Sequence, residues 1–394
     1  MFAVLSSARK AFRRGVAALS LVALTACDAS LVTDLGAGSG GPSVDPNAPI
    51  PVALLVPRSD AGAASVAQSL ENAARLAIAD LNGVRIDLRV YDTAGNAGIA
   101  ASQAQKAVDE GAKIILGPLF GEAANAAGNA VADEGINVLA FSNNPSIAGG
   151  NVFVLGPTFF NTADRLLGYA RARGRNSIVV VHPANTEGEF GRSAIQQAAE
   201  RNGVRIAAVE SFPFNEAGVA AAVPRVRGTL QSTGANGVFL TSTPAGALPL
   251  LLQLMPEAGI SPQTTQYMGL ARWDVPPQTL GLPGAQGGWF TLPDQNMQRS
   301  FTERYVAAFD GSPHPLAGLA FDGIAAVGAL AAQGRRDALT GGALTQTAGF
   351  QGTGGVFRLL SDGTTERALA VATVRNNSVV ILDPAPSGFG GAGF

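Results

Sequence analysis

The sequence predicts an α/β protein built from two doubly wound lobes, each with a parallel β-sheet. From residue 52 onward, short apolar runs alternate with amphipathic stretches, which is typical of parallel sheets covered by helices on both faces. The layout occurs twice, because Val52-Ala-Leu-Leu-Val-Pro57 has a counterpart in Ile178-Val-Val-Val-His-Pro183. In both halves the next helix is followed by Asn-Gly-Val-Arg-Ile, at residues 82–86 and 202–206. The repeated order of elements therefore predicts two similar lobes.

The first half predicts parallel strands joined by helices. A long helix is expected at residues 63–81, because apolar side chains such as Val66, Leu70 and Ala73 recur there at helical spacing. Loops that follow the strands carry Pro, Gly and Asn, as turns require. The expected strands lie at residues 52–56, 85–91, 113–116, 137–140 and 152–155.

The second half continues this pattern and then departs from it. Residues 355–360, 368–375 and 378–382 look like antiparallel strands that turn at Asp362-Gly363 and Asn376-Asn377. The parallel strands before them are expected at residues 178–183, 204–211, 237–241 and 266–270.

The start of the chain carries the features of a bacterial lipoprotein signal. A basic segment at residues 9–14 precedes an apolar run at residues 15–26 that is too short to span a bilayer. The run ends in Leu-Thr-Ala-Cys, which resembles a lipobox, so we expect cleavage before Cys27 and acylation of Cys27. An ordinary signal peptide with a chance cysteine is the alternative. Residues 28–51 are rich in Gly, Ser, Pro and Asp and predict a flexible linker.

Composition excludes several classes of function. Removal of residues 1–26 takes away four basic residues and no acids, which changes the formal charge from −2 to −6. A chain of this charge without a basic stripe is not expected to bind nucleic acid. Two histidines and one cysteine offer no Cys/His metal site, and GxSxG, Walker and HExxH motifs are missing. We therefore expect neither an enzyme nor a protein with a metal or cofactor.

Several segments, in this order along the chain, resemble the leucine/isoleucine/valine-binding family of type I periplasmic binding proteins. They include VALLVP at residue 52, GAKIILGPLFGEAA at residue 111, VVVHPANTEGEFGRSA at residue 179 and LAGLAFDGIAAVGAL at residue 316. The resemblance covers about residues 50–383. It implies two lobes joined by a three-strand hinge, with a ligand in the cleft between them.

The resemblance also implies where the lobes begin and end. The three crossings are expected near residues 155–158, 284–288 and 350–355. The expected organisation is a signal peptide (1–26), a linker (27–51), a first lobe (52–156 plus 286–350), a second lobe (157–285 plus 351–384) and a disordered tail (385–394).

Candidate ligand-binding residues lie in loops after the strands, because open parallel sheets bind ligands beyond the carboxyl ends of their strands. Helix N-termini there suit a carboxylate. The resemblance implies that Ser142 and Asn143 match a hydroxyl-bearing loop and that Phe190 replaces a ring-stacking tyrosine. Phe120 and Gly121 stand where amino-acid-binding members have a Ser or Thr.

The acid that pairs the ligand ammonium in the family would fall at residues 270–271, which are apolar here, and Asp274 is displaced from it. Trp273 either lines the cleft or packs on the second lobe, and Asp322 either contacts ligand or favours a helix dipole. The predicted ligand-binding residues are Ser59, Phe120, Gly121, Ser142, Asn143, Glu189, Phe190, Thr241, Trp273, Asp274 and Asp322.

Two non-enzymatic functions follow from the resemblance. The first is a receptor of an ABC importer, lipid-anchored in the periplasm, that captures amino acids or a related solute and delivers it to the permease. The second is an activator of peptidoglycan synthesis, because residues 272–290 and 300–309 are also similar to penicillin-binding protein activators. The partners implied are a small-molecule ligand, a membrane reached through the lipid anchor, and either an ABC permease or a penicillin-binding protein.

Overall fold

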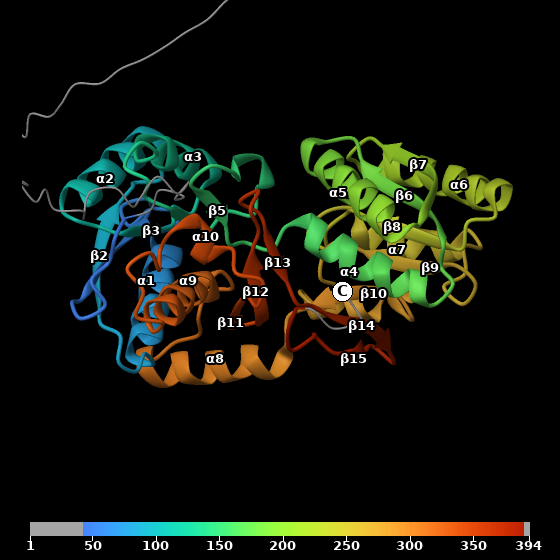
Figure 1. Ribbon diagram of the computed structural model, residues 1–394. Coiled ribbons are helices and arrows are strands. Elements are labelled where there is room, and N and C mark those ends of the chain that lie inside the picture. Colours follow the sequence, from blue (N-terminus) through green and yellow to red (C-terminus); the bar gives the residue numbers. More distant parts are fainter. Residues whose placement is uncertain (1–41, 390–394) are drawn as a thin grey trace, which may run out of the picture. The chain divides into compact units, whose positions relative to one another are not determined.

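The computed structural model describes residues 42–389, which form two α/β lobes with one large sheet each (Figure 1). This confirms the predicted fold class. The predicted signal segment, Cys27, most of the linker and the last five residues of the predicted tail lie outside the described residues.

The first sheet is entirely parallel and has the strand order β2-β1-β3-β4-β5. Its inner strand β1, between β2 and β3, is buried on both faces, because Val52 and Leu54 enter one core while Ala53 and Leu55 enter another. This alternation explains the continuous apolar run in the sequence. The strands are β1 (Ile50–Val56), β2 (Ile86–Asp92), β3 (Ile114–Leu116), β4 (Val138–Ala140) and β5 (Val152–Val154).

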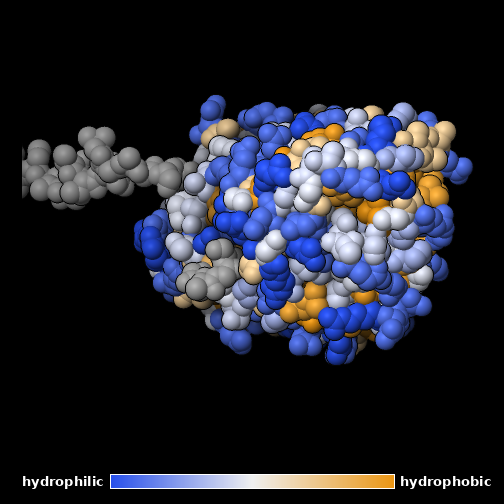
Figure 2. All heavy atoms as spheres, turned by 90° about the vertical axis from the view of Figure 1, so that its right-hand side faces the viewer, coloured by the Kyte–Doolittle hydropathy of each residue, from blue (hydrophilic) through white to orange (hydrophobic). Residues whose placement is uncertain are grey.

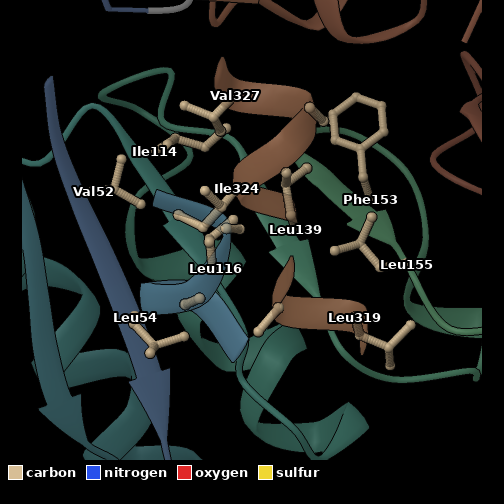
Figure 3. Close-up of a cluster of buried hydrophobic side chains, with 14 of the residues drawn as sticks. Val52, Leu54, Ile114, Leu116, Leu139, Phe153, Leu155, Leu319, Ile324 and Val327 are labelled. Carbon is tan, nitrogen blue, oxygen red and sulfur yellow. The ribbon is translucent and has the colours of Figure 1, made fainter. Parts of the chain in front are cut away.

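Helices cover both faces of the first sheet. Helix α1 (Ala64–Ala79) packs with α9 (Ala317–Ala331) on one face, where Ile324 and Val327 meet side chains of the strands (Figure 3). Helices α2 (Ala97–Asp109) and α3 (Gly121–Ala130) contribute alanines to the core on the other face. The remaining helices of this lobe are η1 (Pro145–Ile147), α8 (Gln295–Phe309) and α10 (Gly341–Leu344).

The second sheet has the order β15-β14-β10-β9-β8-β6-β7 and is parallel from β10 to β7. The last two strands are antiparallel, as predicted, and the turn between them places Asn376 and Asn377 at φ values of 50° and 59°. The strands are β6 (Ser177–Pro183), β7 (Arg205–Phe212), β8 (Gly237–Leu240), β9 (Gln266–Gly269), β10 (Trp289–Leu292), β14 (Ala370–Arg375) and β15 (Ser378–Asp383).

The helices of the second sheet also form two layers. Helices α4 (Phe159–Ala172) and α5 (Thr186–Asn202) share a core with Val180 and Phe239. Helices α6 (Glu216–Thr233) and α7 (Leu248–Glu257) bury the opposite face together with Leu240. Two short 3₁₀ helices, η2 (Pro277–Gly281) and η3 (Pro283–Ala285), follow β9.

A small antiparallel sheet differs from the sequence-based expectation. It consists of β11 (Phe350–Gly352), β12 (Gly355–Leu359) and β13 (Thr365–Arg367). The Asp362-Gly363 turn therefore leads into β13, and the expected strand at residues 368–375 is shortened to β14. Phe350 and Phe357 belong to the first lobe's core, so the small sheet packs with that lobe.

Two of the three chain crossings lie away from their expected positions. The first runs through residues 155–158, between β5 and α4, as expected. Strand β10 belongs to the second sheet, although the sequence assigned residues 286–350 to the first lobe, so the second crossing follows it at residues 293–294. The third lies at residues 368–369, because β11 to β13 stay with the first lobe. These boundaries depend on which sheet a strand joins, and the sequence of the strand alone does not give its partners.

None of the helices within residues 42–389 is both long and apolar enough to cross a bilayer. The face in Figure 2 is mostly polar, with several small separate apolar patches.

Candidate functional site

Five of the eight large exposed apolar side chains in the described residues lie near the carboxyl edges of the two sheets. Ile99 and Phe120 follow β2 and β3 in the first lobe. In the second lobe, Phe190, Phe214 and Val275 follow β6, β7 and β9, and both phenylalanines are 56% exposed. Exposed apolar groups mark binding surfaces, and this is the edge that ligands of open α/β sheets use.

A pocket of about 1100 Å³ opens beside these edges. The first lobe contributes the loop at residues 143–146 and the β12–β13 turn, and the second lobe contributes one face each of α4 and α5. Among the predicted binding residues, Asn143 and Phe190 line this pocket, one from each lobe. The structure therefore brings together two sequence-predicted residues that lie on different sheets.

The start of α3 lies next to this loop. Phe120 occupies the N-cap position and cannot accept a hydrogen bond through its side chain, so no side chain caps the first N–H groups of α3. A Cβ at Gly121 would lie 3.4 Å from the Ser142 hydroxyl and 3.6 Å from the Asn144 amide nitrogen. Glycine thus leaves room where a hydroxyl, an amide and free N–H groups meet, which suits a carboxylate.

Ser142 is placed by its own loop. It is buried, and its Oγ accepts a hydrogen bond of 3.1 Å from the backbone N–H of Asn144. The Asn144 side-chain oxygen in turn accepts from the N–H of Ser146 at 3.0 Å. These contacts fix the loop and leave the Ser142 O–H available as a donor toward α3.

Ser59 lies in a neighbouring loop of the first lobe, away from the pocket lining. It is exposed, and its N–H donates to Asp92 Oδ1 at 3.2 Å, which ties the loop after β1 to the end of β2. Burial alone would raise the pKa of Asp92, but hydrogen bonds from Ser59, Ala94 and Arg58 outweigh it and lower the pKa. Asp92 therefore holds this loop as a carboxylate anion.

The first turn of α5 forms the second lobe's side of the pocket. Asn185 caps the helix through a 2.8 Å hydrogen bond from the N–H of Gly188. Glu187 and Phe190, three residues apart on one face of the helix, both line the pocket. Glu189 points elsewhere, because it accepts a 2.8 Å hydrogen bond from Arg192, which lowers its pKa. Glu189 is thus not brought into the pocket.

Thr241 lies beneath α5 rather than in the pocket. It is 4% exposed, and a Cβ at Gly191 would lie 3.0 Å from its Cβ. Its hydroxyl has no hydrogen-bond partner within the described residues. The close approach of α5 to β8 therefore covers the predicted residue.

Trp273 and Asp274 do not form the predicted binding wall. Trp273 is fully buried and stacks on Phe290 with ring centroids 5.8 Å apart, so it packs in the second core. Asp274 binds Arg272 through two contacts of 3.0 and 2.6 Å. Its charge is already paired, although its side chain is close to the expected edge of the sheet.

Asp322 is also a structural residue in this arrangement. It is 1% exposed and accepts hydrogen bonds from Arg367 at 2.8 Å and from the N–H of Thr353 at 2.7 Å. Arg367 donates in addition to the carbonyl oxygen of Leu155. One buried ion pair thereby joins α9 to the chain segments of the first and third crossings.

Sequence reasoning missed Glu187, Asn144 and Arg367. Glu187 could have been found from its position three residues before Phe190 at the start of a capped helix. Asn144 follows two residues that were identified, and its role depends on the approach of α3. Arg367 lies in a three-residue strand without an apolar pattern, so no local signal marks it.

Comparison with known proteins gives the family. A family model described as periplasmic binding protein matches residues 49–378. A search of curated proteins finds no match.

The fold matches solved structures at low sequence identity. A protein described as a branched-chain amino acid ABC transporter from Rhodospirillum rubrum has a TM-score of 0.72 and 18% identity, covering 85% of this chain and 100% of its own. An ABC transporter substrate-binding protein from Desulfitobacterium hafniense in complex with Leu has a TM-score of 0.61 and 16% identity, covering 85% and 100%. A solute-binding protein from Rhodopseudomonas palustris BisB5 in complex with 3,4-dihydroxy benzoic acid has a TM-score of 0.55 and 17% identity, covering 86% and 98%.

These structures share the two-lobed fold described above, and the family model spans both lobes of this chain. The chain belongs to the periplasmic binding protein family.

Proposed function

We propose that this protein is the solute receptor of an ABC importer and binds an amino-acid-type ligand in the pocket between its lobes. The observation that carries the proposal is the pocket itself, which takes Asn143 from one lobe and Phe190 from the other. The uncapped start of α3 and Ser142 lie outside the pocket lining but next to its loop at residues 143–146, and their donors suit a ligand carboxylate. Acylation at Cys27 would hold the receptor at the periplasmic side of a membrane.

The lobes would close on the ligand by a hinge motion about the three crossings. Closure buries exposed apolar groups such as Phe120 and Phe190, which stabilises the closed form only when ligand fills the space between them. The permease would then recognise the closed receptor.

Calorimetry with leucine, isoleucine, valine and polar amino acids tests this function. The matched variants are Phe190→Ala and Phe214→Ala, because both rings are 56% exposed but Phe190 lines the pocket and Phe214 does not. We expect micromolar binding that Phe190→Ala weakens about tenfold, the effect of about 1.4 kcal/mol, and that Phe214→Ala leaves unchanged. Equal effects of the two substitutions would contradict a ligand in this pocket.

The Arg272–Asp274 ion pair bears on the ammonium of such a ligand. Because Arg272 already neutralises Asp274, we expect Asp274→Ala to change amino-acid affinity little. A loss of tenfold or more would assign the ammonium to Asp274, as the sequence suggested.

The same ion pair favours a second candidate function, activation of a penicillin-binding protein. If no unpaired carboxylate at residues 270–274 binds a ligand ammonium, the segment at residues 272–290 is free to contact a penicillin-binding protein instead. Absence of binding to every amino acid, together with capture of a purified penicillin-binding protein in a pull-down, would replace the receptor function by this one.

A further inference from the structure

The pocket is much longer than a single amino acid. The N-cap of α4, Thr158, and its C-cap, Arg173, both line it, so the pocket follows this helix from end to end. Fourteen residues at 1.5 Å each make about 21 Å. Helix α5 lines the pocket from Thr186 to Asn202 in the same way. We refer to this elongated pocket as the α4–α5 groove.

Small side chains alternate with long ones along the groove. Gly168 and Ala172 on α4 and Ala194 on α5 line it together with longer side chains such as Tyr169 and Gln197. Ser193 and Gln197 offer a hydroxyl and an amide along the same wall. Groups of this kind can bind the N–H and C=O groups of an extended chain.

Most charged side chains that line the groove are already paired. Arg201 lies between Asp164 and Glu366 at 3.6 and 3.7 Å, and Arg165 binds Asp383 at 2.9 Å. Asp362 accepts hydrogen bonds from Thr364, and Arg367 binds Asp322. These residues satisfy one another and leave little charge for a ligand.

Within residues 42–389, three charged residues that line the groove have no ion-pair partner: Glu187, Arg173 and Asp362, whose carboxylate accepts hydrogen bonds from Thr364. Arg173 instead lies over the ring of Tyr169, with its guanidinium carbon 3.5 Å from the ring centroid. Glu187 and Arg173 flank β6 on opposite ends, because Arg173 precedes this strand and Glu187 follows it. Seven strand residues span about 23 Å at 3.3 Å each. The groove thus has an unpaired anion at one end and an unpaired cation at the other.

We propose that the α4–α5 groove binds a short extended peptide of about six residues, since a fully extended chain covers about 3.3–3.6 Å per residue. Its N-terminal ammonium pairs with Glu187 and its C-terminal carboxylate pairs with the guanidinium of Arg173. The inference rests on the proposed receptor function and names the class of solute that this pocket takes.

Calorimetry with alanine, trialanine and hexaalanine tests the length of ligand that the groove requires, because these three probes differ mainly in chain length. We expect hexaalanine to bind at least tenfold more tightly than trialanine. Amidation of its C-terminus removes the partner of Arg173, and acetylation of its N-terminus removes the partner of Glu187, so each modification weakens binding about tenfold.

Variants locate the two ends of the peptide. Arg173→Gln is expected to weaken the binding of hexaalanine about tenfold and to leave the binding of the amidated peptide unchanged. Glu187→Gln is expected to weaken the binding of hexaalanine about tenfold and to leave the binding of the acetylated peptide unchanged. The controls are Arg171→Gln and Glu200→Gln, on the same two helices but outside the groove lining, and both should bind as the parent does. Circular dichroism verifies that all four variants fold.

The outcomes separate this inference from the proposed function. Micromolar binding of free amino acids with no gain for hexaalanine, or hexaalanine binding that Arg173→Gln does not affect, overturns the peptide inference and keeps the receptor function. Failure of both amino acids and peptides to bind overturns both.

Discussion

Tyr91, at the end of β2, couples the stability of the first lobe to alkaline pH. Its hydroxyl donates to Glu110 at 2.7 Å, and burial together with this carboxylate raises the pKa of Tyr91 to about 12. The neutral phenol is therefore favoured in the folded state. The stability that this raised pKa contributes is complete below the pKa of tyrosine in the unfolded chain, near 10, and is lost as pH rises toward 12.

Chemical denaturation at pH 9 to 12 measures this effect. Two pKa units correspond to about 2.7 kcal/mol, so we expect the parent to lose roughly 2–3 kcal/mol more than Tyr91→Phe across this range. Parallel stability curves for the two proteins would show that Tyr91 does not titrate as described.

We propose that membrane attachment depends on Cys27. Two acyl chains anchor a protein stably, since each buried methylene contributes about 0.8 kcal/mol. We expect Cys27→Ala to abolish labelling by a radioactive fatty acid and to release the protein from membranes. Unchanged labelling and retention would contradict the lipoprotein assignment.

Two residues, Trp273 and Asp322, show why some roles could not be predicted from the sequence. Trp273 lies between two charged residues and therefore resembles a cleft aromatic, but glycines at positions 269 and 288 give its ring a place in the core. A Cβ at either glycine would lie 2.1 Å from a ring atom of Trp273. Asp322 likewise looks like a site acid until Arg367, far away in sequence, is known to bind it. Such pairings arise from tertiary contacts, which local patterns do not contain.

At the scale of elements, strand β13 connects the lobes through two neighbouring side chains. Arg367 binds Asp322 and the Leu155 carbonyl in the first lobe, whereas Glu366 faces Arg201 of α5 in the second lobe at 3.7 Å. Successive residues of a strand point to opposite sides. A three-residue strand can therefore hold both lobes at the hinge.

Loss of the buried ion pair between Arg367 and Asp322 is expected to destabilise the protein. Arg367→Met leaves the buried Asp322 carboxylate without its partner and should lower the free energy of unfolding by about 3–5 kcal/mol. The double variant Asp322→Asn with Arg367→Met removes both charges and should recover most of this loss. As a control, Arg335→Met at an exposed ion pair with Asp337 should change stability little.

Urea denaturation of the four proteins provides the comparison. If Arg367→Met lowers the free energy of unfolding no more than Arg335→Met does, the buried Arg367–Asp322 ion pair does not stabilise the hinge as described.

The elements themselves were largely predictable. Strands buried on both faces, such as β1 and β6, appear as continuous apolar runs, and β14 and β15 were identified by their asparagine turn. Strand β10 was assigned to the wrong lobe, because membership of a sheet depends on its partners β9 and β14 and not on its own sequence. Strand β13 carries Thr, Glu and Arg and has no apolar pattern to find.

At the scale of the whole molecule, two lobes joined by three crossings should change shape when ligand binds. We expect X-ray scattering to give a smaller radius of gyration for the protein saturated with its ligand than for the ligand-free protein. A matched sample of Phe190→Ala, at concentrations where it stays unbound, should keep the ligand-free value. An unchanged radius at saturation would contradict hinge closure.

The central claim is that the solute binds between the lobes, in the pocket shared by Asn143 and Phe190. A crystal structure with the tightest-binding amino acid or peptide tests it most directly. We predict ligand density that contacts the loop at residues 143–146 in one lobe and the first turn of α5 in the other. Density for a tight ligand outside this pocket would contradict the account.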